Sequence, residues 1–283
     1  MEGFFACGKE VGGSVQVPIY ICAMMKLICE LACVPMRREP ADRSEMTNQV
    51  VFGETMELLD QNDKWYFVQL DHDGYQGWVD RKQVQPLESL LKGEPTVAPM
   101  FFAARNKAGI LQFLPAGSLL WEVNGLSFRC GTHEMELMEP SANAPQSLNL
   151  VRSAWMSLRA PYLWGGRTLF GMDCSGFTQL TFRLAGKWIQ RDSSQQAEEG
   201  EIINFIEESK NGDLAFFDNP EGKITHVGIV FSDEKTGSKS IIHCSGEVRI
   251  DKIDSYGIFN EAAGTYSHNL RLIRRIGVAP FSK

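Results

Sequence analysis

The sequence predicts an α+β protein in which two small β-barrels precede a C-terminal domain of helices followed by antiparallel strands. Short strand-like runs separated by Gly, Asp and Asn fill residues 31–87, and such runs are typical of a small barrel. A second series of short apolar segments occupies residues 99–138. Beyond residue 147 a helical apolar repeat comes first and strand-like runs follow, which is the order expected of an α+β domain.

Residues 29–90 are predicted to form the first barrel. Tyr75–Val79 (YQGWV) follows a turn at Asp71–Gly74 (DHDG), and the two together resemble the signature hairpin of bacterial SH3-like domains. Arg37–Pro40 (RREP), near the start of the region, resembles the same domain. The predicted strands of this barrel include Val50–Phe52, Thr55–Leu59, Trp65–Leu70 and Gly77–Val79.

Residues 91–142 are predicted to form a second, degenerate SH3-like barrel. It begins with a linker at Lys92–Pro99 (KGEPTVAP), and its strand-like runs include Gly109–Leu114 and Ser118–Val123. The composition then shifts to small residues and proline at Pro140–Pro145 (PSANAP), which we interpret as the boundary with the last domain.

The last domain is predicted over residues 143–283. Within Ser147–Leu158 apolar residues recur at i, i+3 and i+4 spacings, which predicts a helix with one face on a core. A second helix is expected to begin at Cys174, because apolar residues at helical spacing follow it and Gly186 supplies a stop. The predicted strands are Asp213–Phe217, Thr225–Phe231 and Ser240–His243.

The composition argues against several classes of partner. A hydrophobic fraction of 43% with 22% charged residues is that of an ordinary globular protein. A formal charge of −7, with no run of Lys and Arg, argues against nucleic acid as a partner. No stretch of about 18 apolar residues occurs, so no membrane-spanning helix is expected. We expect a monomer without a cofactor. We also expect no metal site, since Cys22, Cys29 and Cys33 lack zinc-site spacing.

The segment 1–28 stays unassigned. The seven cysteines are an odd number without paired spacing, and they do not indicate a disulfide framework. Met1–Cys7 (MEGFFAC) is too short for a signal peptide, yet its end resembles that of a lipoprotein signal, which would allow a lipid anchor at Cys7. The expected location is the cell envelope or periplasm, with the cytoplasm as the open alternative.

Cys174 has the surroundings of a nucleophile. Asp173 is the expected N-cap and Cys174 the first helical residue, so the positive end of the helix dipole favours a thiolate. The Asp173 carboxylate opposes a second anion beside it, and a cationic histidine would offset that effect. The alternative is a buried and inert cysteine.

Two histidines are predicted to meet on one strand pair. Alternation in Ile224–Val230 places His226 and Gly228 on one face of a strand, and Ser232–Lys239 reads as a polar hairpin loop. A hairpin centred in that loop brings His226 nearly opposite His243, at a side-chain separation of about 5 to 8 Å. Two imidazoles so placed suit a base and the group that fixes its tautomer, although two unrelated histidines stay the alternative.

Five motifs occur in order over about residues 150–280. They are Ala160–Gly166 (APYLWGG), Asp173–Phe177 (DCSGF), Asn211–Leu214 (NGDL), Thr225–Gly228 (THVG) and Ile242–His243 (IH). Together they resemble the NlpC-type papain-like cysteine peptidases, and the SH3-like modules ahead of them extend the resemblance to the YkfC-type γ-D-glutamyl-L-diamino-acid endopeptidases. Cys244, where that family commonly has Ala, departs from the pattern.

The resemblance implies a reaction and a substrate. Cys174 would attack the γ-glutamyl carbonyl, His226 would move the proton and His243 would orient His226. Tyr162 would stabilise the oxyanion together with the Cys174 backbone N–H. The first barrel would close one end of the cleft, so that the enzyme would cut murein stem peptides (L-Ala-γ-D-Glu-diamino acid) already freed from glycan.

The resemblance also assigns the residues that line the substrate site. Those that would receive the free L-Ala amine are Glu45, Tyr75, Asp173 and Ser175. Trp164 would pack along the peptide, and the D-Glu side would be lined by Arg191, Asp192 and Ser193. Diaminopimelate and lysine both stay open as the third residue of the peptide.

Two other functions stay open. The chain would be a binding protein for wall peptides if the papain-like domain had lost activity, although the intact Cys174, His226 and His243 set argues against this. It would be an acyltransferase if the same acyl-enzyme were resolved by an acceptor other than water.

Overall fold

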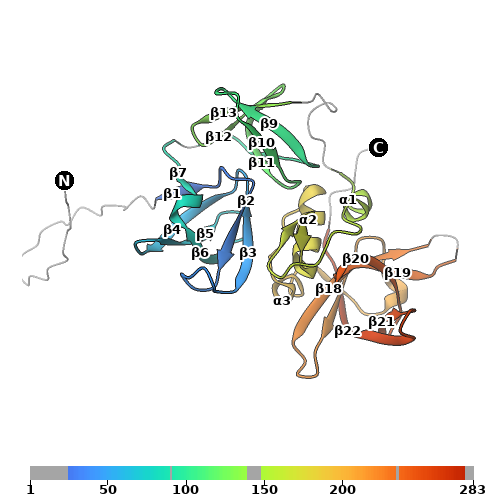
Figure 1. Ribbon diagram of the computed structural model, residues 1–283. Helices are drawn as coiled ribbons and strands as arrows, with labels where there is room; N and C mark the ends of the chain where they lie inside the picture. The colour runs from blue at the N-terminus through green and yellow to red at the C-terminus, as the bar shows by residue number, and fades with distance from the viewer. Residues whose placement is uncertain (1–24, 90, 139–147, 234–235, 278–283) are drawn as a thin grey trace, which may run out of the picture.

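The computed structural model describes residues 25–89, 91–138, 148–233 and 236–277. The expectations for residues 1–24, for a lipid anchor at Cys7 and for a boundary at 140–145 lie outside these ranges. Figure 1 shows a first barrel in blue and cyan beside a yellow-to-red C-terminal domain, with a green second barrel above both. Among the helices within the described ranges, none combines the length and the apolar character that a membrane crossing requires.

The first barrel is a seven-stranded antiparallel sheet in the order β3-β2-β6-β5-β4-β1-β7. Alternating apolar residues on its strands, Val34 and Met36 on β2 and Val68 and Leu70 on β5 among them, are fully buried in one core. Its strands are β1 (Lys26–Ile28), β2 (Cys33–Arg37), β3 (Met46–Val51), β4 (Thr55–Gln61), β5 (Trp65–Leu70), β6 (Gln76–Asp80) and β7 (Gln85–Pro86), with a 3₁₀ turn, η1, at Arg81–Gln83.

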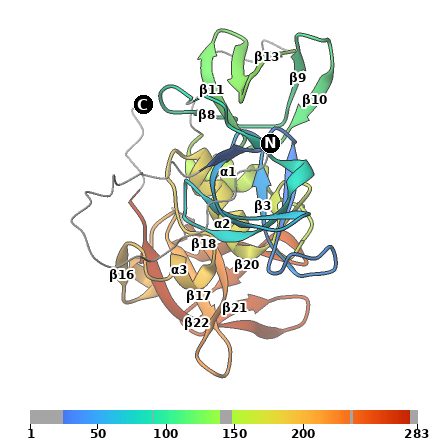
Figure 2. The ribbon, with the colours of Figure 1, turned by 90° about the vertical axis from the view of Figure 1, so that its left-hand side faces the viewer.

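The second barrel is a six-stranded sheet in the order β10-β9-β13-β12-β11-β8. Figure 2 shows it at the opposite end of the molecule from the strands of the C-terminal domain. Its β11 contacts the first barrel, because the Leu119 N–H donates to the Phe52 carbonyl at 2.8 Å and Trp121 Nε1 donates to the Gly53 carbonyl at 2.8 Å. Its strands are β8 (Thr96–Val97), β9 (Phe102–Asn106), β10 (Leu111–Leu114), β11 (Leu119–Asn124), β12 (Ser127–Cys130) and β13 (His133–Leu137).

The C-terminal domain places helices before and beside an antiparallel sheet, as the predicted α+β class requires. The sheet order is β16-β22-β17-β18-β19-β20-β21, and β21 pairs back with β22, so six of the strands close into a barrel. The helices are α1 (Leu150–Met156), α2 (Cys174–Leu184) and α3 (Ser193–Gln196), and a 3₁₀ turn, η2, covers Ile206–Glu208. The strands are β14 (Arg167–Thr168), β15 (Gly171–Met172), β16 (Glu201–Ile203), β17 (Leu214–Asp218), β18 (Ile224–Ser232), β19 (Lys239–Ser245), β20 (Glu247–Ile253), β21 (Gly257–Asn260) and β22 (Thr265–Arg275).

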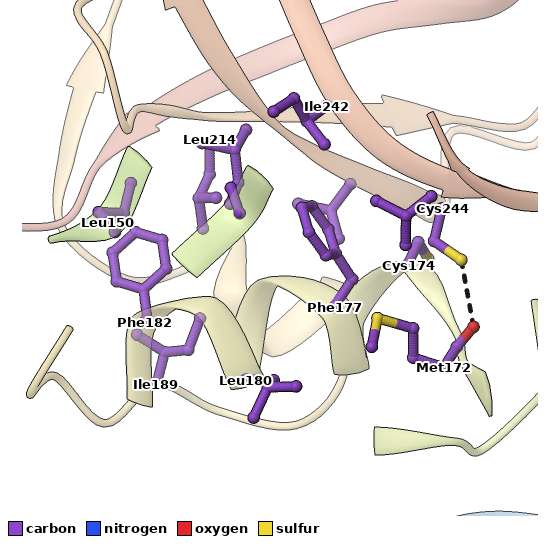
Figure 3. Close-up of a cluster of buried hydrophobic side chains, with 14 of the residues drawn as sticks. Leu150, Met172, Cys174, Phe177, Leu180, Phe182, Ile189, Leu214, Ile242 and Cys244 are labelled. Carbon is purple, nitrogen blue, oxygen red and sulfur yellow. Dashed lines mark hydrogen bonds between the residues drawn. The ribbon is translucent and has the colours of Figure 1, made fainter. Parts of the chain in front are cut away.

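Helix α2 is buried along its whole length between the sheet and the two other domains. Phe177 packs beside Ile242 of β19, as Figure 3 shows, and Leu180 lies on the opposite side of the helix near the β10–β11 turn of the second barrel. Burial of a Phe or Leu side chain stabilises a fold by about 1.5 to 3 kcal/mol. This packing fixes the axis of the helix, and with it the position of Cys174 at its start.

A buried charge network joins the first barrel to the C-terminal domain. Glu54 is fully buried, and Arg167 donates to both of its carboxylate oxygens, at 3.0 and 3.1 Å. Arg183 of α2 donates to the same carboxylate. Burial alone would raise the pKa of Glu54, but Arg167, His72 and Arg183 outweigh it and lower that pKa to about 2. The two domains therefore share one ionised cluster.

Candidate active site

Cys174 is the first residue of α2, as predicted, and Asp173 caps the helix. An Asp173 carboxylate oxygen accepts the Gly176 N–H at 2.7 Å, which satisfies one of the free donors of the first turn. Burial, and after it the Asp173 carboxylate, raises the pKa of Cys174 to about 12. The helix dipole does not outweigh these two effects, so the thiol is protonated at neutral pH and needs a base to become a nucleophile.

The thiol lies against the strand that carries His226. Cys174 Sγ is 4.0 Å from the Thr225 carbonyl oxygen, and the Val227 backbone N–H also interacts with it. These two backbone groups flank His226. Strand β19 pairs with β18 only from Gly228 onward, so the edge of β18 beside Cys174 is not covered by β19. The thiol therefore lies against the backbone on both sides of His226.

His226 and His243 share a face and a hydrogen bond. Their ring nitrogens, Nε2 of His226 and Nδ1 of His243, are 2.8 Å apart. The register pairs His243 with Gly228, so His226 and His243 are diagonal neighbours on one face of the strand pair. Their ring centroids are 5.0 Å apart, and the predicted meeting of the two side chains is confirmed.

A carboxylate completes this row of side chains. His243 Nε2 is 2.9 Å from Asp251 Oδ2, and the other oxygen of Asp251 accepts from Arg249 Nη2 at 2.7 Å. Burial would raise the pKa of Asp251, but the hydrogen bonds from His243 and Arg249 outweigh it and hold that pKa below its ordinary value. Asp251 is therefore an acceptor, and His243 Nε2 carries the proton between them.

This arrangement fixes both tautomers. With its proton on Nε2, a neutral His243 presents a lone pair at Nδ1, so His226 must donate from Nε2. A neutral His226 then keeps its lone pair on Nδ1, and this nitrogen is able to accept a proton. Burial, followed by the neighbouring His243 and His268, holds the pKa of His226 well below its ordinary value, so the ring is neutral at pH 7.

His268 of β22 stacks on His226. Its ring centroid is 4.2 Å from that of His226, with 25° between the planes. Burial, and then His243, lowers the pKa of His268 to about 4, so a neutral ring covers one face of His226. Phe217 also contacts both rings, with centroid distances of 5.8 Å to His226 and 5.9 Å to His268.

A pocket of about 420 Å³ opens beside Cys174. Its wall contains every residue that the sequence assigns to substrate binding, and the first barrel supplies part of that wall. His226, His243 and Tyr162 do not line it. The residues of the wall are Arg38, Glu45, Thr47, Tyr75, Trp164, Asp173, Cys174, Ser175, Arg191, Asp192, Ser193, Ser194, Ile224 and Thr225.

The Asp173 carboxylate is occupied within the protein. Arg191 donates to both of its oxygens, at 2.7 and 3.0 Å, and the Gly165 N–H donates to one of them at 2.9 Å. Arg191 is almost fully buried, and Asn48 of the first barrel accepts from its Nε at 2.8 Å. Ser175 Oγ accepts from the same guanidinium at 2.8 Å. We infer that Asp173 and Arg191 shape the pocket wall more than they offer free charges to a ligand.

Glu45 and Asp192 lie nearer the solvent. Glu45 accepts from Trp164 Nε1 at 2.7 Å and pairs with Arg38 at 2.9 Å. Burial raises the pKa of Asp192, against the opposing effect of Arg191. With Asp173 the wall holds three carboxylates and two guanidinium groups, so its formal charge is negative by one. Such a wall favours a cationic group of a ligand.

Tyr162 lies beside the thiol without lining the pocket. Its N–H donates to the Gly246 carbonyl at 2.9 Å, and the residue is 37% exposed. Burial, and after it the proximity of Cys174, raises the pKa of Tyr162 to about 12. The phenol therefore keeps its proton and is available as a donor near the sulfur.

Comparison with known proteins decides the family. A model described as the NlpC/P60 family matches residues 159–264, and one described as a bacterial dipeptidyl-peptidase Sh3 domain matches residues 36–84. A γ-D-glutamyl-L-lysine dipeptidyl-peptidase from Bacillus subtilis is 30% identical over 202 residues, which are 64% of this chain and 68% of the relative. The chain belongs to the NlpC/P60 family. The predicted family of cysteine peptidases, with an SH3-like domain ahead of the catalytic one, is confirmed.

Other relatives extend over most of this NlpC/P60 peptidase. A γ-D-glutamyl-L-lysine dipeptidyl-peptidase from Bacillus cereus is 25% identical over 263 residues, 78% of this chain and 74% of the relative. The crystal structure of an NlpC/P60 family protein from Bacillus cereus has a TM-score of 0.70 at 20% identity, and the match covers 90% of this chain and all of the other. This likeness shows that the two chains share their overall fold.

Three residues of this NlpC/P60 site were not predicted from the sequence. Asp251 and His268 lie on β20 and β22, two strands that the sequence analysis did not propose, and Asn48 reaches the site from the first barrel. The strand that carries Asp251 could have been predicted, because the apolar Val248 and Ile250 alternate with polar residues there. His268 carried no such signal, since the strand around it is largely polar.

Proposed function

We propose that the protein is a cysteine endopeptidase that hydrolyses the γ-D-glutamyl–diamino-acid bond of free murein stem peptides and releases L-Ala-γ-D-Glu. The observation that carries the proposal is the pocket beside Cys174 whose far wall belongs to the first barrel, through Glu45, Thr47 and Tyr75. Its volume of about 420 Å³ lies within the range of small-ligand sites. The names of the two Bacillus relatives support the same bond.

The position of the first barrel favours a short substrate with a free amine. A peptide whose γ-glutamyl carbonyl lies at Cys174 would direct its N-terminal L-Ala toward Glu45 and Tyr75. The excess of carboxylates over guanidinium groups there suits an ammonium group, whereas an acylated amine would lose that attraction and meet the barrel. Peptides still attached to glycan through the L-Ala amine would therefore be poor substrates.

The reaction would use the tautomer of His226 that leaves its Nδ1 free to accept a proton. As Cys174 Sγ attacks the γ-carbonyl carbon, its proton would pass to His226 Nδ1, and Tyr162 with the Cys174 N–H would donate to the oxyanion. Collapse of the tetrahedral intermediate would break the C–N bond, and the departing amine would take the proton from His226. A water molecule, deprotonated by His226, would then hydrolyse the thioester and restore the thiol.

Defined peptides test this function. The wild-type enzyme should release L-Ala-γ-D-Glu from L-Ala-γ-D-Glu-L-Lys or from its diaminopimelate analogue, as read by mass spectrometry. Cys174→Ala should abolish release with the fold intact, whereas Cys33→Ala, a cysteine outside the pocket, should keep it. N-acetylation of the L-Ala should lower kcat/KM by about tenfold or more, the loss expected of a charge-assisted hydrogen bond. Release by Cys174→Ala, or equal rates on both substrates, would refute the proposal.

A further inference from the structure

The inner face of the C-terminal barrel carries a polar ring at one end. One or more apolar residues from each of the six strands fill the barrel interior. His226 shares its face with Val230 on β18, and Asp251 shares its face with Ile253 on β20. His268 pairs with Ile258 across β21 and β22. The base, its partner and two further titratable residues thus meet inside the barrel.

The contact between His243 and Asp251 is shielded from water. The side chain of His243 is 2% exposed and that of Asp251 is 9% exposed. Both carboxylate oxygens of Asp251 have partners, Oδ2 with His243 and Oδ1 with Arg249. A carboxylate held at both oxygens in a site of low polarity keeps one orientation, and its charge acts strongly on the group it contacts.

We propose that Asp251 is a positioning residue of the catalytic machinery, which sets the tautomer of His243 and through it that of His226, and whose charge stabilises the imidazolium formed during catalysis. The proposal rests on the assignment of Cys174 and His226 as nucleophile and base, and it adds a fourth member to that row. Arg249 tempers the effect, because its guanidinium neutralises part of the Asp251 charge.

The atoms assign a direction to each hydrogen bond. Asp251 accepts from His243 Nε2, and His243 Nδ1 accepts from His226 Nε2. If Asp251 were absent, His243 could carry its proton on Nδ1 and accept at Nε2. His226 would then be forced to accept at Nε2 and to hold its proton on Nδ1, which leaves no lone pair on the nitrogen that must take the thiol proton.

Substitutions of Asp251 and Arg249, both on β20, should shift the pH profile in opposite directions, and this tests the proposal. The titratable groups that contact the His226 ring are His243 on β19 and His268 on β22. Asp251 and Arg249 on β20 are joined to it through His243, and Cys174 on α2 lies beside the backbone of Thr225 and Val227. Asp251→Asn removes a negative charge, so the acid limb of the pH profile should move to lower pH. Arg249→Gln removes a positive charge and leaves the Asp251–His243 bond, so the limb should move to higher pH.

Alkylation of Cys174 by iodoacetamide measures these shifts without any peptide. Its rate against pH reports the base and the thiol, so a failure of the proposed substrate would leave this test intact. Asp251→Asn should lower the maximal rate about 10- to 100-fold, the effect of losing a hydrogen bond to a charged group. Asp254→Asn, a carboxylate after the same strand that bonds to Tyr266 instead, is the matched control and should match the wild type.

A mutant cycle separates positioning from mere stability. If Asp251 acts through His243, its replacement by Asn should cost little further rate in a His243→Gln background. An unshifted acid limb in Asp251→Asn, or equal losses in both backgrounds, would overturn the proposal. If Asp251→Asn does not fold by circular dichroism, Arg249→Gln decides alone, and a limb that stays in place or moves to lower pH would overturn it.

Discussion

Replacement of Glu54 by Gln should destabilise the whole molecule. Glu54 is fully buried and balances Arg167 and Arg183, which are 4% and 2% exposed. The amide keeps the shape of the side chain but removes the one carboxylate to which both buried guanidinium groups donate. Loss of one partner from a buried ion pair costs about 3 to 5 kcal/mol. In a chain of this size the loss corresponds to a fall in Tm of about 6 to 15 °C.

The opposite replacement at the same cluster should cost less. Nε and Nη2 of Arg183 have no hydrogen-bond partner within the described residues, so this guanidinium is only partly satisfied. Arg183→Met keeps much of the packing volume and leaves Arg167 to neutralise Glu54. We expect a loss of about 1 to 2 kcal/mol, well below that of Glu54→Gln.

Urea and thermal unfolding of the two variants, followed by circular dichroism, measure this asymmetry. Glu57→Gln, on β4 directly after Glu54 and partly exposed, controls for the change from carboxylate to amide. The electrostatic reasoning fails if Glu54→Gln unfolds within about 1 kcal/mol of the wild type, or if Arg183→Met is the more damaging of the two.

Two further predictions concern the site. Gly165 has φ +74°, and a Cβ there would lie 2.4 Å from the Met46 carbonyl oxygen of the first barrel, whereas Gly222 has φ +77° and open space around it. Gly165→Ala should therefore lower the free energy of unfolding by about 1 to 3 kcal/mol more than Gly222→Ala. Thermal unfolding and peptide cleavage compare the two variants, and equal losses of stability would contradict the contact. Burial holds the pKa of His226 well below its ordinary value, so this imidazole stays neutral in mildly acidic solution. If His226 is the base, kcat/KM should fall only well below pH ~6.5, and an acid limb at or above that pH would contradict the prediction.

Local signals in the sequence were sufficient to predict the helix that begins at Cys174. Asp173 as cap, the apolar spacing and Gly186 give the bounds of α2 as the structure has them. Strand β5 was also predicted with its exact residues, because Trp65–Leu70 alternates between turn residues. The helix predicted over Ser147–Leu158 is shorter, Leu150–Met156, because the cap is Asn149, whose side chain accepts the Arg152 N–H.

Long-range features of the site were not predictable in this way. The closure of the barrel by β21 and β22 joins segments whose pairing no local pattern fixes, and it brings His268 onto His226. The contact of Asn48 with Arg191 crosses 143 positions of sequence. The raised pKa of Cys174 depends on burial, which the helix dipole argument did not include.

The ties between the first barrel and the catalytic loops limit how freely these modules can be exchanged. Asn48 holds Arg191, Gln49 accepts from the backbone and the side chain of Arg167, and Glu54 neutralises a charge on α2. A chimera that received a different barrel would keep the buried cations near Cys174 without their partners, unless the new barrel supplied equivalent acceptors at the same places. The first barrel and the C-terminal domain can therefore be transferred to another protein only as a pair.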